Sequence, residues 1–359
     1  MEKIFKKIIG KAVWAASGDN SQPWRFVLEN DGFYIFNLSD RDIPLYNWGQ
    51  RGSLVAHGGL IENVKILASQ EGYETKVNLF PDPDETDLVA QISLEKSEKK
   101  REPLADFIRE RATNRRPYQN SALTDDQRQQ LLMTVDEIGA GRLILLEDPA
   151  QRKLAAEASS VNEIIVLETP ELHRQFFRHV VWTEKEERAK RTGLYVKTLE
   201  MTPPQELIFK LFSHWRAAQI LNKLGFSKLV AKSNAELYAT GAAMGAIIFT
   251  DNRAENFVLA GRLLQRLWLK ATQMGMSLHP ITGVLFLMQR ILAQEVAGGL
   301  KPEQVEMIGR AHQKIVDLLG IRQDQGTIAM FFRLGFSQPP SAHSSRLQPE
   351  IVNLQKTIS

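Results

Sequence analysis

A run of charged residues at positions 95–102 constrains the fold most strongly, because it divides the 359 residues into a short first part and a long second part. Charged runs of this kind lie in solvent and often separate folded units. The first part has the spacing of helix, strand, strand, helix, strand and strand, at 3–16, 24–28, 33–38, 52–72, 76–80 and 88–94. The sequence therefore predicts an α+β unit over residues 1–98.

The second part, residues 99–359, carries a similar mixture of elements. Periodicity and turn residues predict helices near 103–112, 124–137, 150–168 and 254–275, and strands at 142–146, 244–250 and 327–334. Thr124 and Gln127 have the spacing of a capping box, which marks a helix start. The long helices 52–72 and 254–275 occupy corresponding places in the two parts. We expect an exposed tail over residues 338–359.

Residues 170–235 have no counterpart in the first part. Aromatic and aliphatic residues lie among Lys and Arg at helical spacing there, which predicts amphipathic helices. Three interpretations remain open for this insertion: helices that pack on the core, a lid over a site, or a helix on a membrane surface.

Composition excludes several classes of function. The chain has no cysteine, which excludes disulfides, thiolate metal sites and a cysteine nucleophile. A net charge of +3 is small for this length and argues against a dedicated nucleic-acid binder. The sequence has neither a signal-peptide pattern nor an apolar run of about 20 residues. We therefore expect a cytoplasmic protein, with no nucleic-acid partner and without membrane association.

Two polar segments carry candidate binding residues. The segment Ser17-Gly-Asp-Asn20-Ser-Gln-Pro-Trp follows the first helix in a turn, where short polar side chains can reach a ligand. The segment Arg111-Ala-Thr113-Asn-Arg115 has two guanidinium groups four residues apart, which a helical turn would place on one face. Arginine forks bind phosphate by charge-assisted bonds. The alternative for the second segment is a solvated basic helix face.

Both segments resemble the flavin mononucleotide (FMN)-dependent nitroreductases. The first is similar to the Ser-x-x-Asn-x-Gln-Pro-Trp signature of that family, and the second is similar to its Arg-x-Ser-x-Arg/Lys segment, with Thr113 in place of Ser. Ordinary members carry these segments in the reverse order and are two-fold dimers with the flavin at the interface. The chain therefore resembles a fused, degenerate dimer with one intact site, as in the dormancy-associated, single-chain Acg branch.

The resemblance implies roles for these residues. Arg111 and Thr113 would bind the phosphate or ribityl end of FMN, and Arg115 would face the N1–C2 edge of the ring, where a cation tunes the cofactor. By the same resemblance, Ser17 and Asn20 would form hydrogen bonds to the flavin from the opposite half of the chain.

Two later segments extend the resemblance. His279-Pro280-Ile-Thr282-Gly283 is similar to the Pro-Ile-x-Gly loop of the family, which implies that the Thr282 backbone N–H points at flavin N5 and that Gly283 permits close backbone approach. A plain structural turn is the alternative. Ser344-Ser-Arg346-Leu is similar to the Lys/Pro-x-Arg-Leu segment, whose Arg reaches the phosphate, although Ser344 replaces a common cation.

Together these similarities imply an α+β fold, a three-layer α-β-α sandwich whose two unequal halves form a pseudo-dimer. The implied function is an FMN-dependent oxidoreductase in which NAD(P)H reduces FMN and a nitro compound or quinone then takes the electrons. No dinucleotide motif occurs, so NAD(P)H would bind transiently over the flavin. No general acid is identifiable from the sequence.

Other possibilities stay open from the sequence. The alternative function is a flavin-binding or flavin-storing protein with little turnover, and a peripheral membrane protein is a third class. We expect a monomer because the dimer is fused, with a homodimer as the alternative.

Overall fold

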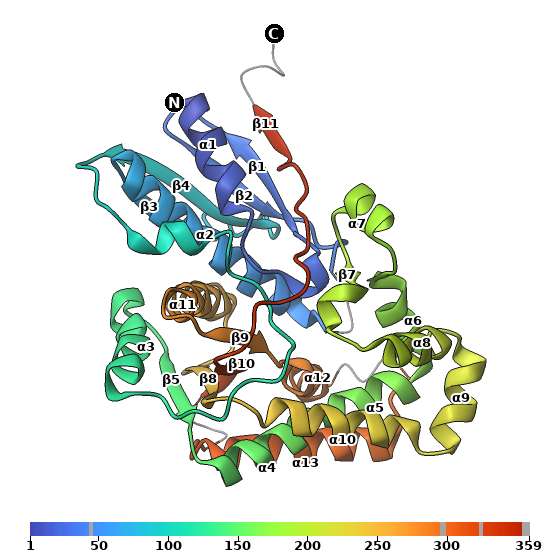
Figure 1. Cartoon of the computed structure of the whole chain (residues 1–359). Helices are drawn as coiled ribbons and strands as arrows, with labels where there is room; N and C mark the ends of the chain where they lie inside the picture. The colour runs from blue at the N-terminus through green and yellow to red at the C-terminus, as the bar shows by residue number, and fades with distance from the viewer. Residues whose placement is uncertain (43–45, 295–298, 323–325, 354–359) are drawn as a thin grey trace.

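The computed structural model describes residues 1–42, 46–294, 299–322 and 326–353 (Figure 1). Two principal sheets with helices around them confirm the expected α+β class. The first sheet has the strand order β11-β1-β2-β4-β3. Its elements are α1 (Glu2–Ala12), β1 (Trp24–Leu28), β2 (Gly32–Asn37), α2 (Arg51–Glu71), β3 (Tyr73–Leu79), β4 (Leu88–Lys96) and β11 (Ile351–Asn353).

The alternating residues of the first sheet explain how it packs. Residues of β1 alternate between buried and half-buried positions, so one face of the strand meets the core. Phe5 of α1 packs against Phe33 of β2 with ring centroids 5.9 Å apart. Ile8 and Ile9 are buried on the same helix, one turn after Phe5. The first helix is therefore fixed on the sheet by its apolar side.

The second sheet has the order β5-β8-β10-β9 with antiparallel pairing. These strands are β5 (Arg142–Leu146), β8 (Ala243–Phe249), β9 (Ser277–Pro280) and β10 (Thr327–Gly335). Side chains of β8 are buried on both faces: Ile247 belongs to the core shared with α11, and Met244 and Ile248 belong to a second core. This sheet therefore lies between two helix layers.

The helices around the second sheet form two groups. On one side lie η3 (Pro103–Phe107), α3 (Asp125–Ile138) and α11 (Ala254–Gln273), and on the other lie α4 (Pro149–Ser159), α5 (Val161–Glu168), α12 (Gly283–Leu292) and α13 (Pro302–Leu318). Thr124 and Gln127 form the expected capping box at the start of α3, with reciprocal bonds of 3.2 and 3.0 Å. Gly139, in the left-handed conformation, ends the same helix.

The long helices α2 and α11 join the two parts of the chain. A Cβ built on Gly58 would lie 1.9 Å from the carbonyl oxygen of Val258, and one built on Gly261 would lie 1.9 Å from that of Val55. The two helix backbones therefore touch, which only glycine allows at these positions. Beside this contact the buried Glu62 carboxylate pairs with two arginines of α11, Arg262 at 3.1 Å and Arg266 at 2.7 Å.

Residues 170–238 form a helical insertion with a small core of its own. Its elements are α6 (Pro170–His179), β6 (Val180–Val181), α7 (Glu184–Lys190), β7 (Leu194–Tyr195), η4 (Val196–Leu199), α8 (Pro203–Phe212), α9 (Trp215–Lys223) and α10 (Phe226–Tyr238). His173 is buried there against Phe177 and Trp215. The amphipathic helices expected from the sequence are present.

Two sequence-based expectations were wrong. The helix expected near 103–112 is only the short 3-10 helix η3, followed by a turn and an extended segment. The C-terminal tail is not simply exposed: it crosses from the second sheet to the first, where β11 pairs in parallel with β1 at Phe26–Ile351 (Figure 1). Residues 354–359 of the expected tail lie outside the described residues.

Within the part of the chain that the structure describes, no helix has the length and apolar character needed to cross a bilayer.

Candidate functional site

The turn after α1 has a strained backbone. Three residues that are not glycine have positive φ there: Asp19 at 44°, Asn20 at 57° and Gln22 at 51°. Each such residue costs on the order of 1–3 kcal/mol and persists only where surrounding contacts impose it. Strain of this kind concentrates at functional sites, so the turn is a structural candidate independent of its sequence signature.

Contacts from two distant segments impose this conformation. The Asn20 amide donates to the carbonyl oxygens of Arg191 and Ser345, both at 3.1 Å. The Gln22 amide donates to the same Arg191 oxygen at 2.8 Å, and its Oε1 accepts from the Leu347 N–H at 2.9 Å. Ser17 Oγ accepts from the Gln22 N–H at 3.0 Å. The turn is therefore held between the insertion and the C-terminal tail, and Ser17 and Asn20 lie beside the Arg346 segment.

Two arginines converge on the end of α1. Arg111 Nη2 donates to the Trp14 carbonyl oxygen at 2.9 Å, and Arg346 Nη2 donates to that of Ala15 at 3.4 Å. The Arg111 guanidinium lies 4.5 Å from the centroid of the Trp268 ring, and that of Arg346 lies 5.5 Å from the Trp14 ring. Arg346 and Ala15 are 331 positions apart in the chain, so distant segments meet at this cluster of two cations.

This cluster has little compensating negative charge: the Glu187 carboxylate, bound to the neighbouring Ser345, acts only on Arg346. Arg111 is 5% exposed, Arg346 is half-buried, and the Nε of each is enclosed without a hydrogen-bond partner. Within the described ranges, neither guanidinium forms an ion pair with a carboxylate. Burial and the Arg346 charge lower the pKa of Arg111 to about 9, and burial lowers the pKa of Arg346 to about 10. The cluster is suited to an anion, because an anion would supply the missing charge and partners.

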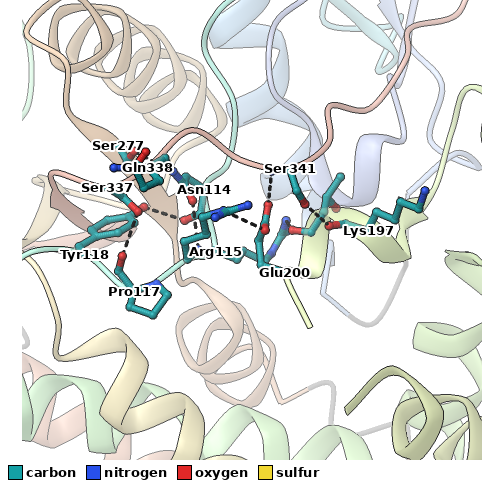
Figure 2. Close-up of polar contacts among 12 residues, drawn as sticks. Asn114, Arg115, Pro117, Tyr118, Lys197, Glu200, Ser277, Ser337, Gln338 and Ser341 are labelled. Atoms are coloured by element: carbon teal, nitrogen blue, oxygen red, sulfur yellow. Dashed lines mark hydrogen bonds and ion pairs between the residues drawn. The ribbon is translucent and has the colours of Figure 1, made fainter. Parts of the chain in front are cut away.

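Arg115 lies in an extended segment, so the helical turn expected over 111–115 is wrong. Asn114 accepts from the Arg116 N–H at 3.0 Å and donates to Ser277 Oγ and the Gln338 carbonyl at 3.0 and 2.8 Å (Figure 2). Pro117 also disfavours helical geometry in the residue before it. Thr113 pairs with Leu278 of β9 as an isolated parallel bridge. Arg111 and Arg115 therefore lie in different parts of the candidate site.

Arg115 lies among buried ionisable groups from both parts of the chain. Its Nη1 donates to the Thr198 carbonyl of the insertion at 3.1 Å. Burial lowers the pKa of Arg115, while Asp19, Tyr238 and other nearby acidic groups act in the opposite direction. Burial raises the pKa of the Asp19 carboxyl, and His179 and Arg115 oppose that rise. Arg115 and the strained turn thus share one polar interior.

The loop between β9 and α12 contains three of the expected site residues. Pro280 ends β9 opposite Phe332, Thr282 is the N-cap of α12, and Gly283 begins that helix. A Cβ on Gly283 would lie 2.2 Å from Asn162 Oδ1. A larger residue at this position would have to displace the Asn162 side chain, and the expected role of Gly283 toward a ligand stays a prediction.

A partly buried polar cluster adjoins this loop, and the sequence analysis did not include it. Asn162 Oδ1 accepts from the Tyr46 hydroxyl at 3.0 Å. The neighbouring Glu163 Oε1 accepts from the Tyr238 hydroxyl at 2.6 Å and from Asn234 Nδ2 at 3.0 Å, while Oε2 is enclosed without a partner. Burial raises the pKa of Glu163 to about 7. The sequence contained one signal for this cluster: Glu163 is an acidic residue directly before the apolar run Ile164, Ile165 and Val166, and acids are rarely buried among apolar residues without a partner.

An open pocket of about 570 Å³ lies beside the Arg115 segment. Arg116 Nε pairs with Glu200 at 3.0 Å across it, and Glu200 also accepts from the Ser341 N–H at 2.6 Å (Figure 2). The insertion, the 111–117 segment and the C-terminal tail therefore form its walls.

The structure thus groups the expected residues in two neighbouring places. Ser17, Asn20, Arg111 and Arg346 surround the end of α1. Thr113 connects through β9 to Pro280, Thr282 and Gly283, and Arg115 lies near Asp19 between the two groups. Missed by the sequence analysis were Asp19, Gln22, Tyr46, Glu163 and Tyr238.

Comparisons with known proteins point in one direction. No family model matches the chain. The chain is 23% identical over 314 residues to the "Putative NAD(P)H nitroreductase acg" of Mycobacterium tuberculosis H37Rv, covering 86% of this chain and 89% of that protein. An uncharacterized protein of M. tuberculosis CDC 1551 is 23% identical over 352 residues, covering 93% of this chain and 46% of that protein.

Solved structures with similarity are also nitroreductases. A nitroreductase with bound FMN from Bacteroides fragilis aligns with a TM-score of 0.35 and 8% identity, covering 68% of this chain and 93% of that one. The FMN-dependent nitroreductase NfnB from Mycobacterium smegmatis in complex with NADPH aligns with a TM-score of 0.35 and 13% identity, covering 67% and 95%. The sequence relationship spans more of this chain than either structural alignment.

Proposed function

We propose that this chain, which is 23% identical to a putative NAD(P)H nitroreductase, is a nitroreductase-type, FMN-dependent NAD(P)H oxidoreductase with one flavin site between its two parts. A small nitro compound or a quinone would be the electron acceptor. The observation that carries this proposal is the Arg111–Arg346 cluster, two cations that form no ion pair among the described residues, each with an enclosed Nε that has no hydrogen-bond partner.

The cluster fits the phosphate of FMN. A phosphate dianion accepts several charge-assisted hydrogen bonds, and the planar forks of Arg111 and Arg346 can donate them. The carbonyl oxygens of Trp14 and Ala15 orient these forks without neutralising them. Thr113, Ser17 and Asn20 would supply hydroxyl and amide groups toward the ribityl chain.

The Arg115 region fits the ring end. FMN, when bound, supplies the two-electron exchange between NAD(P)H and the acceptor. Arg115 would contribute a cation that favours negative charge on the ring. Thr282 stands at the N-cap of α12, where backbone N–H groups have no partner within the helix, and would offer its N–H to the ring.

Glu163 would hold a proton beside this loop. Its neighbour Asn162 touches Gly283, and its own pKa of about 7 leaves the carboxyl partly protonated at neutral pH. Tyr238 and Asn234 fix Oε1, so the enclosed Oε2 is the atom at which a proton would be held. A group with a pKa near the operating pH is suited to general acid–base work.

The decisive experiment begins with the absorbance spectrum of the purified protein, where bound flavin gives a characteristic visible band. Arg111→Met and Arg346→Met should each weaken FMN binding roughly ten- to a hundredfold, because a charge-assisted bond contributes about 1.5–3 kcal/mol. Each variant removes a charge that has no ion pair and also the hydrogen bonds to the Trp14 or Ala15 carbonyl, so the melting temperature of the ligand-free variants is measured beside the wild type to separate loss of flavin binding from loss of folding.

Arg25→Met is the matched control. Arg25 is half-buried like Arg346, and like both site arginines it has an unpartnered Nε and lies over an aromatic ring, that of Phe36 at 5.2 Å, but it is on β1. This variant should retain FMN. Equal loss of flavin in Arg25→Met and Arg111→Met would contradict the site. Flavin that stays bound but supports no NAD(P)H oxidation with a quinone or nitroaromatic would favour a flavin-storing protein instead.

A further inference from the structure

The insertion exposes an unusual concentration of apolar side chains. Six of the eleven large apolar side chains that are exposed in the described part of the chain fall within residues 207–229. Leu207 is 72% exposed and Leu224 is 74% exposed. The six are Leu207, Ile208 and Leu211 of α8, Ile220 of α9, Leu224 after α9, and Leu229 of α10. Single exposed apolar residues are normal, whereas such a concentration marks an interaction surface.

The charged residues around these side chains have one sign. Between Pro203 and Lys232 the exposed cations are Lys210, Arg216, Lys223, Lys228 and Lys232, against one carboxylate, that of Glu206. We call α8, α9 and the start of α10, with these apolar and basic side chains, the α8–α10 surface. Figure 1 shows α9 at the outer end of the molecule, away from the first sheet.

We propose that the α8–α10 surface docks on an anionic phospholipid membrane, with its leucines and isoleucines in the interface and its basic side chains at the headgroups. A helix surface with apolar residues beside Lys and Arg binds lipid by this combination of forces. The sequence-based expectation against membrane association rested on the lack of a long apolar run, which does not bear on docking at a surface.

The charge distribution favours a membrane over a second copy of the chain. A two-fold interface would bring the same surface of two molecules together, so its five cations would face five others. Like charges across an interface oppose association. An anionic bilayer instead attracts each of these basic side chains near its surface.

Vesicle co-sedimentation of the full-length protein tests the proposal. The wild type should bind phosphatidylcholine vesicles that contain phosphatidylglycerol and should bind pure phosphatidylcholine vesicles weakly. The variant Leu207→Gln/Leu211→Gln/Leu224→Gln should bind the anionic vesicles at least tenfold less well, and so should Lys210→Glu/Lys223→Glu/Lys228→Glu. The charge variant keeps the proposal testable if the glutamine variant does not fold.

The matched control is Leu132→Gln/Met133→Gln, which removes two exposed apolar side chains of α3. It should bind anionic vesicles like the wild type. The proposal is overturned if the wild type does not bind anionic vesicles, or if the control loses as much binding as the α8–α10 variants. It is also overturned if the glutamine variant converts a dimer to a monomer in sedimentation velocity while vesicle binding is unchanged, because the occupant would then be a second copy. Flavin content is a separate readout, so failure here leaves the proposed function untouched.

Discussion

At the scale of single residues, the candidate site contains ionisable side chains whose pKa values are shifted by burial. Arg111 and Arg346 are cations that form no ion pair in the described part of the chain, and Glu163 is an acid whose pKa is raised to about 7 by burial. Both conditions reduce the stability of the ligand-free protein. Proteins retain such residues where function requires them.

Glu163 gives a prediction on pH. Its pKa rises from an ordinary value of 4.5 when the chain folds, so between about pH 4.5 and 7 the folded state binds more protons than the unfolded state. The free energy of unfolding should therefore fall as pH rises through this window. Glu163→Gln removes the decrease in the free energy of unfolding that Glu163 causes in this window. The difference in melting temperature, variant minus wild type, should therefore be larger at pH 8 than at pH 5.

The control for this measurement is Glu157→Gln, an exposed glutamate on α4. Its melting temperature should differ from wild type by the same small amount at both pH values. Parallel pH curves for wild type and Glu163→Gln would show that Glu163 does not titrate in this window.

At the scale of elements, the two parts of the chain are joined by a backbone contact between helices. Gly58 of α2 and Gly261 of α11 each meet a carbonyl oxygen of the other helix. Because α2 and α11 lie so close together, Glu62 of α2 can also form buried ion pairs with Arg262 and Arg266 of α11. Site residues from the two parts therefore depend on this contact for their relative position.

Gly261→Ala should destabilise the protein strongly, because its Cβ would lie 1.9 Å from the Val55 oxygen and would force the helices apart. Overpacking of this kind costs typically about 1–3 kcal/mol and sometimes more. Urea unfolding of the ligand-free protein measures the change in the free energy of unfolding.

Gly309→Ala is the matched control, since a Cβ at this position of α13 would meet no atom within 4 Å. It should stabilise the protein by about 0.5–1 kcal/mol through helix propensity. If both variants change stability alike, the close α2–α11 contact is not present in solution.

At the scale of the whole molecule, one site is assembled from segments that span nearly the entire chain. The Trp14 and Ala15 carbonyls come from the first part, and Arg111 and Arg346 come from the second. A second site of the same kind would need a second Arg-x-Ser/Thr-x-Arg segment, and residues 1–359 contain this pattern once, at Arg111–Arg115. The division into 1–98 and 99–359 remains a prediction, and β11 shows that the second part completes the sheet of the first.

FMN titration of the ligand-free protein should therefore saturate at one flavin per chain. Isothermal titration calorimetry gives this stoichiometry together with the affinity. Saturation at two per chain would mean that the second site is also intact, and the interpretation of the chain as a degenerate dimer would be wrong.

The sequence by itself determined the features that follow from local rules. Alternation of apolar residues gave strand β1 at Trp24–Leu28, and helical spacing gave α2 and α11 nearly to their ends. The capping box of Thr124 and Gln127 placed the start of α3. Periodicity and capping act within a few residues, so one sequence contains them. The same rules gave a helix near 103–112 that the structure replaces by a turn and an extended segment.

Only the tertiary structure decided how the candidate site is assembled. It brought Arg346 to Ala15 across 331 positions, placed Asn20 between Arg191 and Ser345, and put Asn162 against Gly283. It also held Arg115 extended through Asn114 where local spacing favoured a helical turn. Contacts of this kind form because the core and both sheets hold distant segments of the chain together. Local spacing in the sequence does not specify which groups become neighbours in this way, or which of them are buried without an ion-pair partner.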